Sequence, residues 1–239
     1  MNMYVIYYLL GFLLLPGIIF AIYAQSKVNS SFNRYKNIDY SSTTPVHSKA
    51  RFFLDAMGLT DVQIVKTQGH LTDNYNPKTD TVSLSESVYD STSIASLGVA
   101  CHELGHVLQH KKGYAPMKLR NFLIPVINIS SFFMWPLVIL GILLEALSYT
   151  NIGYWFIVAG IVIFGLSVIL SAITLPIEKD ASRRAYKMLV GTGELTEEEG
   201  KGVKEVLDAA ALTYVAGLLV SILSFIRFVL AIFLSRSRK

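Results

Sequence analysis

The stretch "VACHELGHVLQH", residues 99–110, decides how this chain folds, and it holds three of the five histidines. Apolar residues before and within it recur three and four positions apart, at Ile94, Leu97, Cys101, Leu104 and Leu108. This is the spacing of one face of an amphipathic helix. We therefore predict a helix over residues 91–111 that carries the histidines.

The HELGH segment has the spacing of a metal site. His102 and His106 are four residues apart, so they return to nearly the same face of a helix, about 6 Å apart along its axis. A catalytic zinc ion takes three protein ligands and leaves one position for water. Glu103 is placed to act as general base toward that water, which zinc makes more acidic. The sequence predicts one Zn2+ per chain, with His102 and His106 as ligands and Glu103 as the catalytic residue.

Two other residues of this helix, His110 and Cys101, are not expected to bind the metal ion. His110 continues the four-residue spacing, but it lies about 12 Å along the axis from His102, too far for one ion to bind both without a break in the helix. We expect it to support the site or to lie at an interface. Cys101 is the single cysteine, which excludes an intramolecular disulfide and is compatible with a reducing compartment.

Outside this helix the chain is strongly apolar, with 52% hydrophobic and 16% charged residues, unlike a soluble globular protein. The excess lies in four runs, residues 4–24, 122–144, 152–175 and 209–234, each near the roughly 20 residues that a membrane-spanning helix needs. The first lacks a basic n-region, so we interpret it as an anchor rather than a cleaved signal peptide. The last contains Arg227 and either spans the membrane or is partly interfacial. We predict an α-helical integral membrane protein with about four transmembrane helices.

Two segments between these runs are polar enough to form a domain outside the lipid. Residues 25–121 begin with a polar linker at 26–42 and continue with a short helix from Thr44 to Gly58. Alternating residues then predict strands in "DVQIVKT" (61–67) and "TVSLS" (81–85), with "GHLTDNY" in or beside them. We expect a small α+β, zincin-like catalytic domain. Residues 176–208 should form a loop or a helix that starts anew at Pro176.

The second segment supplies the candidates for a third ligand. Glu178 and Asp180 follow the third apolar run and return to the side of the membrane that carries HELGH, whereas Glu145 lies on the opposite side. A carboxylate near the lipid is costly unless it is paired or binds a metal ion. We expect Glu178 to be the third zinc ligand and Asp180 to orient a ligand histidine. The alternative is that both acids only form a salt-bridge cluster with Arg183 and Arg184.

Basic residues near the apolar runs predict the orientation. Thirteen lie on the side of the two polar segments and three on the other side. Because cytoplasmic flanks are enriched in Lys and Arg, the prediction is a multi-pass protein of the cell membrane with its active site at the cytoplasmic face. These flanks also account for the net charge of +4, so no nucleic-acid partner is expected. The thirteen are Lys27, Arg34, Lys36, Lys111, Lys112, Lys118, Arg120, Lys179, Arg183, Arg184, Lys187, Lys201 and Lys204.

Several motifs together resemble a known family. The segments "SFNRYK" (31–36), "LTDNYNP" (71–77), "LSESVY" (84–89), "SIASLGVACHELGHVLQH" (93–110) and "LPIEKDASRRA" (175–185) are similar to the YugP-like family of bacterial membrane zinc metallopeptidases. The resemblance covers nearly the whole chain. It implies a neutral zinc endopeptidase related in layout to the HtpX-like and CAAX-prenyl-protease gluzincins. In those relatives the third ligand lies in an E-x-x-x-D pattern; here Glu178 matches the Glu, but Ser182 stands in the position of the Asp.

The leading hypothesis is a membrane-anchored zinc endopeptidase that cleaves a peptide or membrane-protein substrate, with partner or adaptor proteins left open. Substrate-binding residues are not identified, although "TVSLS" is expected to be the edge strand on which a substrate pairs. The alternative is a non-proteolytic zinc-binding membrane scaffold or transporter. A structural zinc ion usually has four N or S ligands, and transport predicts ionisable groups in mid-span, which only Arg227 approaches.

Overall fold

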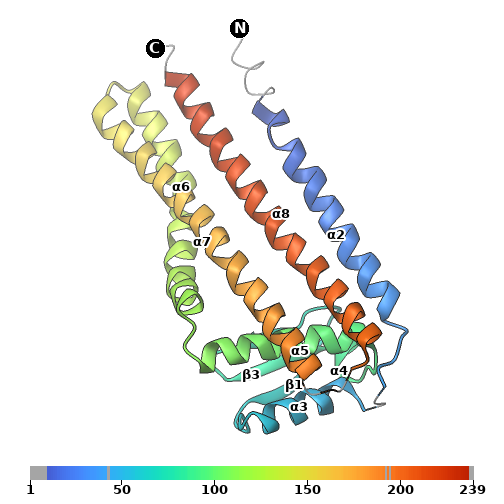
Figure 1. The fold of residues 1–239 in the computed structure, drawn as a ribbon. Coiled ribbons are helices and arrows are strands. Elements are labelled where there is room, and N and C mark those ends of the chain that lie inside the picture. Colours follow the sequence, from blue (N-terminus) through green and yellow to red (C-terminus); the bar gives the residue numbers. More distant parts are fainter. Residues whose placement is uncertain (1–9, 42–43, 192, 194, 237–239) are drawn as a thin grey trace. The chain divides into compact units, whose positions relative to one another are not determined.

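The computed structural model describes residues 10–41, 44–191, 193 and 195–236 (Figure 1). Within these residues, four helices are long and apolar enough to cross a membrane: Leu10–Tyr35, Ala115–Ala146, Asn151–Gly191 and Glu197–Leu234. The remaining elements form a small sheet and short helices. The predicted α-helical integral membrane protein with a small α+β domain is confirmed, although residues 4–9 of the first predicted run lie outside the described part.

The chain divides into two compact units. One consists of Met1–Ile22, Lys118–Leu175 and Tyr214–Lys239, and the other of Tyr23–Met117 and Pro176–Thr213. The long helices α2 (Leu15–Tyr35), α7 (Thr150–Gly191) and α8 (Glu197–Arg236) contribute to both units. The first unit holds the apolar parts of these helices, and the second holds the HELGH motif.

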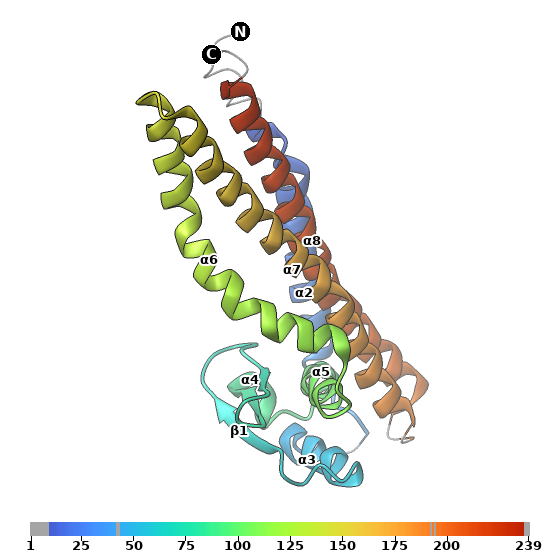
Figure 2. The same ribbon diagram turned by 90° about the vertical axis from the view of Figure 1, so that its left-hand side faces the viewer.

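In the first unit, α6 (Ala115–Ala146) and α7 form an antiparallel pair (Figure 2). Glycines allow their backbones to approach closely: a Cβ atom at Gly153 would lie only 2.5 Å from the Gly141 carbonyl oxygen. The ring centroids of Phe164 on α7 and Phe225 on α8 lie 5.6 Å apart. Many large apolar side chains face outward, for instance Phe132 at 76% exposure. Such a surface is stable in lipid and not in water.

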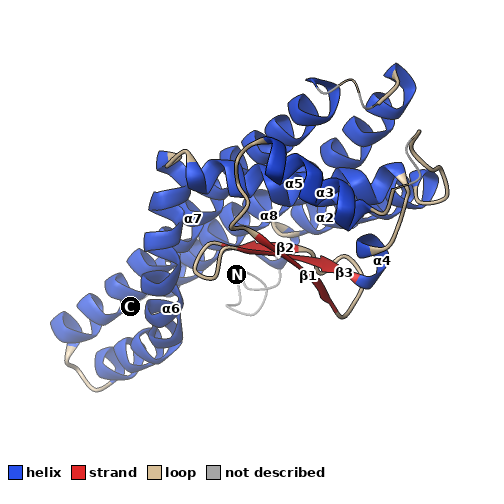
Figure 3. Cartoon of the chain, turned by 90° about the horizontal axis from the view of Figure 1, so that it is seen from below, coloured by secondary structure: helices blue, strands red, loops and turns tan. Residues whose placement is uncertain are grey.

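The second unit contains a sheet of three strands in the order β1-β3-β2 (Figure 3). Strand β1 (Gln63–Thr67) is parallel to β3 (Thr81–Ser85), and β2 (Asn74–Asn76) pairs with β3 in the antiparallel direction. The expectation that "TVSLS" is an edge strand is therefore wrong. Strand β2 is only three residues long and lies in a turn-rich segment, so the sequence pattern did not reveal it as a pairing partner.

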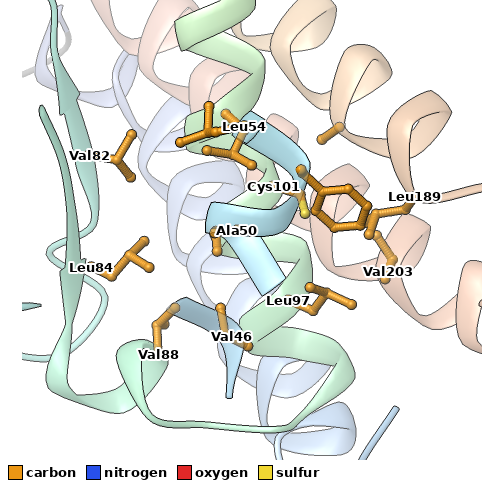
Figure 4. Packing of buried hydrophobic residues seen from close by; sticks show 14 of the residues in the cluster. Val46, Ala50, Leu54, Val82, Leu84, Val88, Leu97, Cys101, Leu189 and Val203 are labelled. Carbon is orange, nitrogen blue, oxygen red and sulfur yellow. The ribbon is translucent and has the colours of Figure 1, made fainter. Parts of the chain in front are cut away.

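Helices α3 (Val46–Ala56), α4 (Glu86–Tyr89) and α5 (Ile94–Lys111) share one core with this sheet. Each buried aliphatic side chain stabilises such a core by about 1.5–3 kcal/mol. Figure 4 shows the packing, in which the buried residues come from α3, α4, α5, β3, α7 and α8: Val46, Ala50, Leu54, Val82, Leu84, Val88, Leu97, Cys101, Leu189 and Val203.

Two helices are longer than the sequence pattern indicates. Helix α2 continues to Tyr35 through much of the expected polar linker, because side chains of its last turns bind Glu205 of α8: Tyr35 donates to the Glu205 carboxylate over 2.9 Å and Arg34 over 3.1 Å. Helix α7 does not start anew at Pro176 but runs through it to Gly191. Proline is tolerated inside a membrane helix where neighbouring groups satisfy the backbone.

Candidate metal centre

Helix α5 positions the two histidines of the HELGH motif. It begins after Ser93, whose hydroxyl accepts a hydrogen bond from the Ser96 amide and so caps the first turn. One face of the helix is buried in the core of the second unit. His102 and His106 leave the helix on one side, with ring centroids 4.8 Å apart and ring planes at 86°.

Glu178 reaches the histidines from α7. Its Oε2 atom lies 3.1 Å from Nε2 of His102 and 3.3 Å from Nε2 of His106. One ligand atom from each of the three residues lies within 4.8 Å of the others. The Glu178 side chain is only 4% exposed. The structure thus brings together the three residues that the sequence proposes as ligands, and within the described chain Glu145 is not part of this group.

The other ring nitrogens also have partners. Nδ1 of His102 lies 3.1 Å from the Ser182 hydroxyl, and Nδ1 of His106 lies 2.9 Å from Oε1 of Gln109. Ser182 stands four positions after Glu178, where the E-x-x-x-D pattern implied by the resemblance would place an aspartate. Its hydroxyl therefore contacts the first histidine from the position of that carboxylate.

Gln109 determines which ring nitrogen of His106 carries the proton. Its side chain is fully buried, and its amide nitrogen donates to the Ile177 carbonyl over 2.8 Å and to Asp180 Oδ2 over 3.0 Å. Because both contacts require the amide nitrogen, the amide oxygen is the atom that faces His106, and it accepts the proton of Nδ1. Nε2 is then the nitrogen left to bind a metal ion, as in histidine ligands generally.

Asp180 does not contact a histidine directly. Its Oδ2 atom accepts from Arg184 Nε over 2.6 Å as well as from Gln109, and its Oδ1 atom lies 3.7 Å from Arg183. The salt-bridge alternative therefore describes Asp180, whereas Glu178 pairs with the histidines. Any influence of Asp180 on His106 passes through Gln109.

The two helices that carry the site pack almost backbone to backbone. A Cβ atom at Gly105 would lie 2.4 Å from the Ala181 carbonyl oxygen, closer than atoms can approach. Gly105 thus lets α5 and α7 come close enough for Glu178 to reach both imidazoles. Leu104, the residue before it, is fully buried in the core.

Glu103 lies beside the first histidine and is 8% exposed. Burial raises the pKa of its carboxyl, and the charges of Glu178 and Asp73 act in the same direction, while His102 and His106 oppose them. For His106, burial disfavours the protonated ring, but the Glu178 carboxylate, the charge of Glu103 and the hydrogen bond to Gln109 together raise the pKa of the imidazole. The centre is thus a set of strongly interacting ionisable groups away from bulk water.

His110 lies apart from the three-residue cluster. Its Nδ1 atom is 2.9 Å from the Tyr75 hydroxyl, which also donates to Asp80 over 2.7 Å. Lys111 pairs with the same Asp80. These contacts tie the end of α5 to β2 and the turn that follows it.

The donor set fits zinc. Two imidazoles and one carboxylate are the ligands of many catalytic zinc sites, and three protein ligands leave a coordination position open. The orientation of Gln109 adds a structural test, since it leaves Nε2 of His106 available on the side of Glu178.

Sequence reasoning missed Gln109 and used Ser182 only as a departure from a pattern. Gln109 lies three residues after His106, so one helical turn brings their side chains together. A fully polar side chain in the apolar stretch of α5 was a readable signal, but its partners on α7 were not.

Comparisons with known proteins agree with this geometry. Residues 10–233 match the family described as "Putative neutral zinc metallopeptidase". The chain is 41% identical over 219 residues to the "Putative membrane protease YugP" of Bacillus subtilis (strain 168), covering 92% of this chain and 94% of that protein. No solved structure matches significantly. With the match extending over both the HELGH helix and the Glu178 segment, the chain belongs to this family of neutral zinc metallopeptidases of the membrane.

Proposed function

We propose that this chain is a membrane-anchored zinc endopeptidase whose metal ligands are His102, His106 and Glu178. The observation that carries the proposal is the convergence of two imidazole Nε2 atoms and a buried carboxylate oxygen, with a second buried carboxyl, Glu103, beside them. A purely structural zinc site usually has four protein ligands and no open coordination position, whereas three residues converge here. The scaffold or transporter alternative therefore has less support.

Glu103 acts as the general base. A bound zinc ion supplies Lewis acidity, which lets water lose a proton near neutral pH. Glu103 accepts that proton and passes it to the amine that leaves when the peptide bond breaks. Its raised pKa suits the first step, because a carboxylate with a raised pKa is a stronger base than an ordinary one and accepts the proton of water more readily.

The substrate segment pairs with β2. Strand β3 has partners on both sides, so it cannot accept another strand along Thr81–Ser83. Strands β1 and β2 are the two edges of the sheet, and β2 is the edge that packs against α5. An extended peptide added to this edge would form main-chain hydrogen bonds independent of its sequence. The substrates are peptides or membrane proteins, delivered with or without an adaptor protein.

The excess of basic residues around the second unit supports an active site at the cytoplasmic face. A substrate would then be cut where it leaves the bilayer on that side.

Glu103→Gln tests the chemistry. The variant keeps the shape of the side chain and the metal ligands but cannot accept a proton. We expect it to hold as much zinc as the unchanged protein and to lose cleavage by about 100-fold or more. Zinc is measured by elemental analysis. Cleavage is measured by mass spectrometry, both on an unfolded test protein and on the membrane proteins of cells that contain either form. Full proteolysis by pure Glu103→Gln protein would show that another group is the base.

A further inference from the structure

A pocket of about 560 Å³ lies in the second unit, apart from the cluster of His102, His106 and Glu178. The ends of three helices form it: Met57 directly follows α3, Leu108 lies in α5, Lys112 directly follows α5, and the rest comes from α7. The residues from α7 are Asp180, Arg183, Arg184, Lys187, Met188 and Gly191. The lining therefore combines apolar residues, two methionines and a leucine, with charged ones.

The charges in this pocket are unbalanced. Four of its residues are basic and one is acidic, so three positive charges remain after one is offset. The acid, Asp180, is already engaged by Arg184 and Gln109. Within the described chain no carboxylate lies within ion-pair distance of Lys112 or Lys187, whereas the neighbouring Lys111 pairs with Asp80.

One of these cations is held in place before any ligand arrives. The Arg184 guanidinium donates from Nε to Asp180 over 2.6 Å, and it lies over the Tyr114 ring at 5.6 Å from the centroid. Its side chain is 24% exposed. A guanidinium fixed in this way still has its two terminal nitrogens as donors, so little conformational entropy is lost when an anion binds.

A phosphate group matches this arrangement. It carries more than one acceptor oxygen around a single centre, and it is bound by guanidinium and ammonium groups that converge from several directions. We propose that the pocket formed by Lys112, Arg183, Arg184 and Lys187 binds a phosphate group, either the headgroup of an anionic lipid or a phosphorylated solute.

A phosphate group could reach this pocket from a lipid or from a solute. Arg183 and Lys187 follow Leu175, the last residue of the apolar part of α7, by eight and twelve residues, about 12 and 18 Å along the helix axis at 1.5 Å per residue. The attraction between anionic headgroups and basic residues falls off within a Debye length, about 8 Å at physiological ionic strength. The experiment therefore distinguishes the two sources.

The test uses the zinc-loaded, full-length protein. In nanodiscs of phosphatidylcholine with a minority of phosphatidylglycerol, native mass spectrometry should show one tightly held phosphatidylglycerol. The variant Lys112→Gln/Lys187→Gln should weaken this binding by about tenfold or more, since each cation contributes near an anionic surface. The matched control is Lys118→Gln/Arg120→Gln, which removes the same charge from a membrane flank outside the pocket and should leave the bound lipid in place.

A second arm separates the two sources of phosphate. In detergent, glycerol phosphate is titrated and followed by the shift in thermal unfolding temperature. Saturable, pocket-dependent binding of glycerol phosphate identifies a solute site, whereas pocket-dependent binding of phosphatidylglycerol alone identifies a lipid site. Equal loss of lipid in both double variants would mean general attraction to the membrane surface and would overturn the proposal, as would the absence of any binding in both arms.

Discussion

At the scale of single residues, Gln109 connects His106 of the site with the Asp180 carboxylate. Its amide oxygen faces His106, and its amide nitrogen faces Asp180. An amide can do both at once because it has donors at one end and acceptors at the other. An apolar side chain of similar size would leave the Nδ1 proton of His106 and one contact of Asp180 without a partner.

We expect Gln109→Leu to weaken zinc binding by about 10 to 100-fold, the usual cost of losing the partner of a ligand histidine. Gln109→Glu keeps an acceptor for His106 but places a carboxylate oxygen where the amide nitrogen donates to Ile177 and Asp180, so it should recover little of the loss. Zinc affinity is measured by competition with a chelator. The control is Gln25→Leu on the exposed side of α2, which should change nothing. Unaltered zinc affinity in Gln109→Leu would remove this role.

The acidic residues should differ in their effect on zinc. Glu178→Ala removes a proposed ligand and should empty the site under chelator concentrations that the unchanged protein withstands. Asp180→Ala acts only through Gln109 and should cost about 10 to 100-fold. Glu145→Ala should have no effect on zinc. If Asp180→Ala released zinc while Glu178→Ala retained it, the assignment of the ligand would be reversed.

These residues also show how much of the site the sequence contains. His102, Glu103 and His106 are readable because their relation is local and depends only on the period of a helix. Glu178 was predicted as a ligand because it lies on the same side of the membrane as the histidines and because an unpaired carboxylate near lipid is energetically costly. The partners of Gln109 and Ser182 were out of reach, because they depend on contacts between α5 and α7 that join residues 68 to 80 positions apart in the chain. The ligand and base roles themselves stay predictions.

At the scale of elements, the contact between α5 and α7 sets the geometry of the site. Gly105 and Gly98 lie on the same helix, but they have different neighbours. A Cβ atom at Gly98 would lie 3.5 Å from a Val203 methyl group, an ordinary contact, whereas at Gly105 it would collide with backbone.

Gly105→Ala should therefore destabilise the protein by about 1–3 kcal/mol and move Glu178 away from the histidines. Gly98→Ala should be neutral or stabilise by up to about 1 kcal/mol, because alanine favours a helix over glycine. Thermal unfolding of both variants in the same detergent gives the comparison. Equal stability of the two would mean that α7 shifts freely and that the close approach does not matter.

The elements were predictable to different degrees. The apolar runs and the period of α5 gave the helices, since length and spacing are properties of the local sequence. Pro176 pointed to a new helix start, but α7 continues through it. A proline is tolerated inside such a helix where neighbouring groups satisfy the freed backbone. The order β1-β3-β2 was not predictable, because β2 has three residues and takes its shape from β3.

At the scale of the whole molecule, the orientation in the membrane rests on the distribution of basic residues. Cysteine introduced near Lys78 or Gly193 should not react with impermeant reagents added to intact cells, whereas cysteine at Asn151 should react. Cys101 is buried and should give little background. The control is the same labelling after the membrane is permeabilised, when all sites should react. Reaction of the Lys78 site in intact cells would place the metal centre on the outer face.

The close approach at Gly105 also bears on how relatives of this chain can be recognised. A search for H-E-x-x-H treats two of the five letters as free. In this fold neither is free, since Leu104 is fully buried and Gly105 faces the Ala181 carbonyl without room for a side chain. Any chain that packs its two site helices in this way must keep a large apolar residue followed by glycine. The more selective signature is therefore histidine, glutamate, an apolar residue, glycine and histidine. The apolar residue and the glycine are required by packing and not by catalysis.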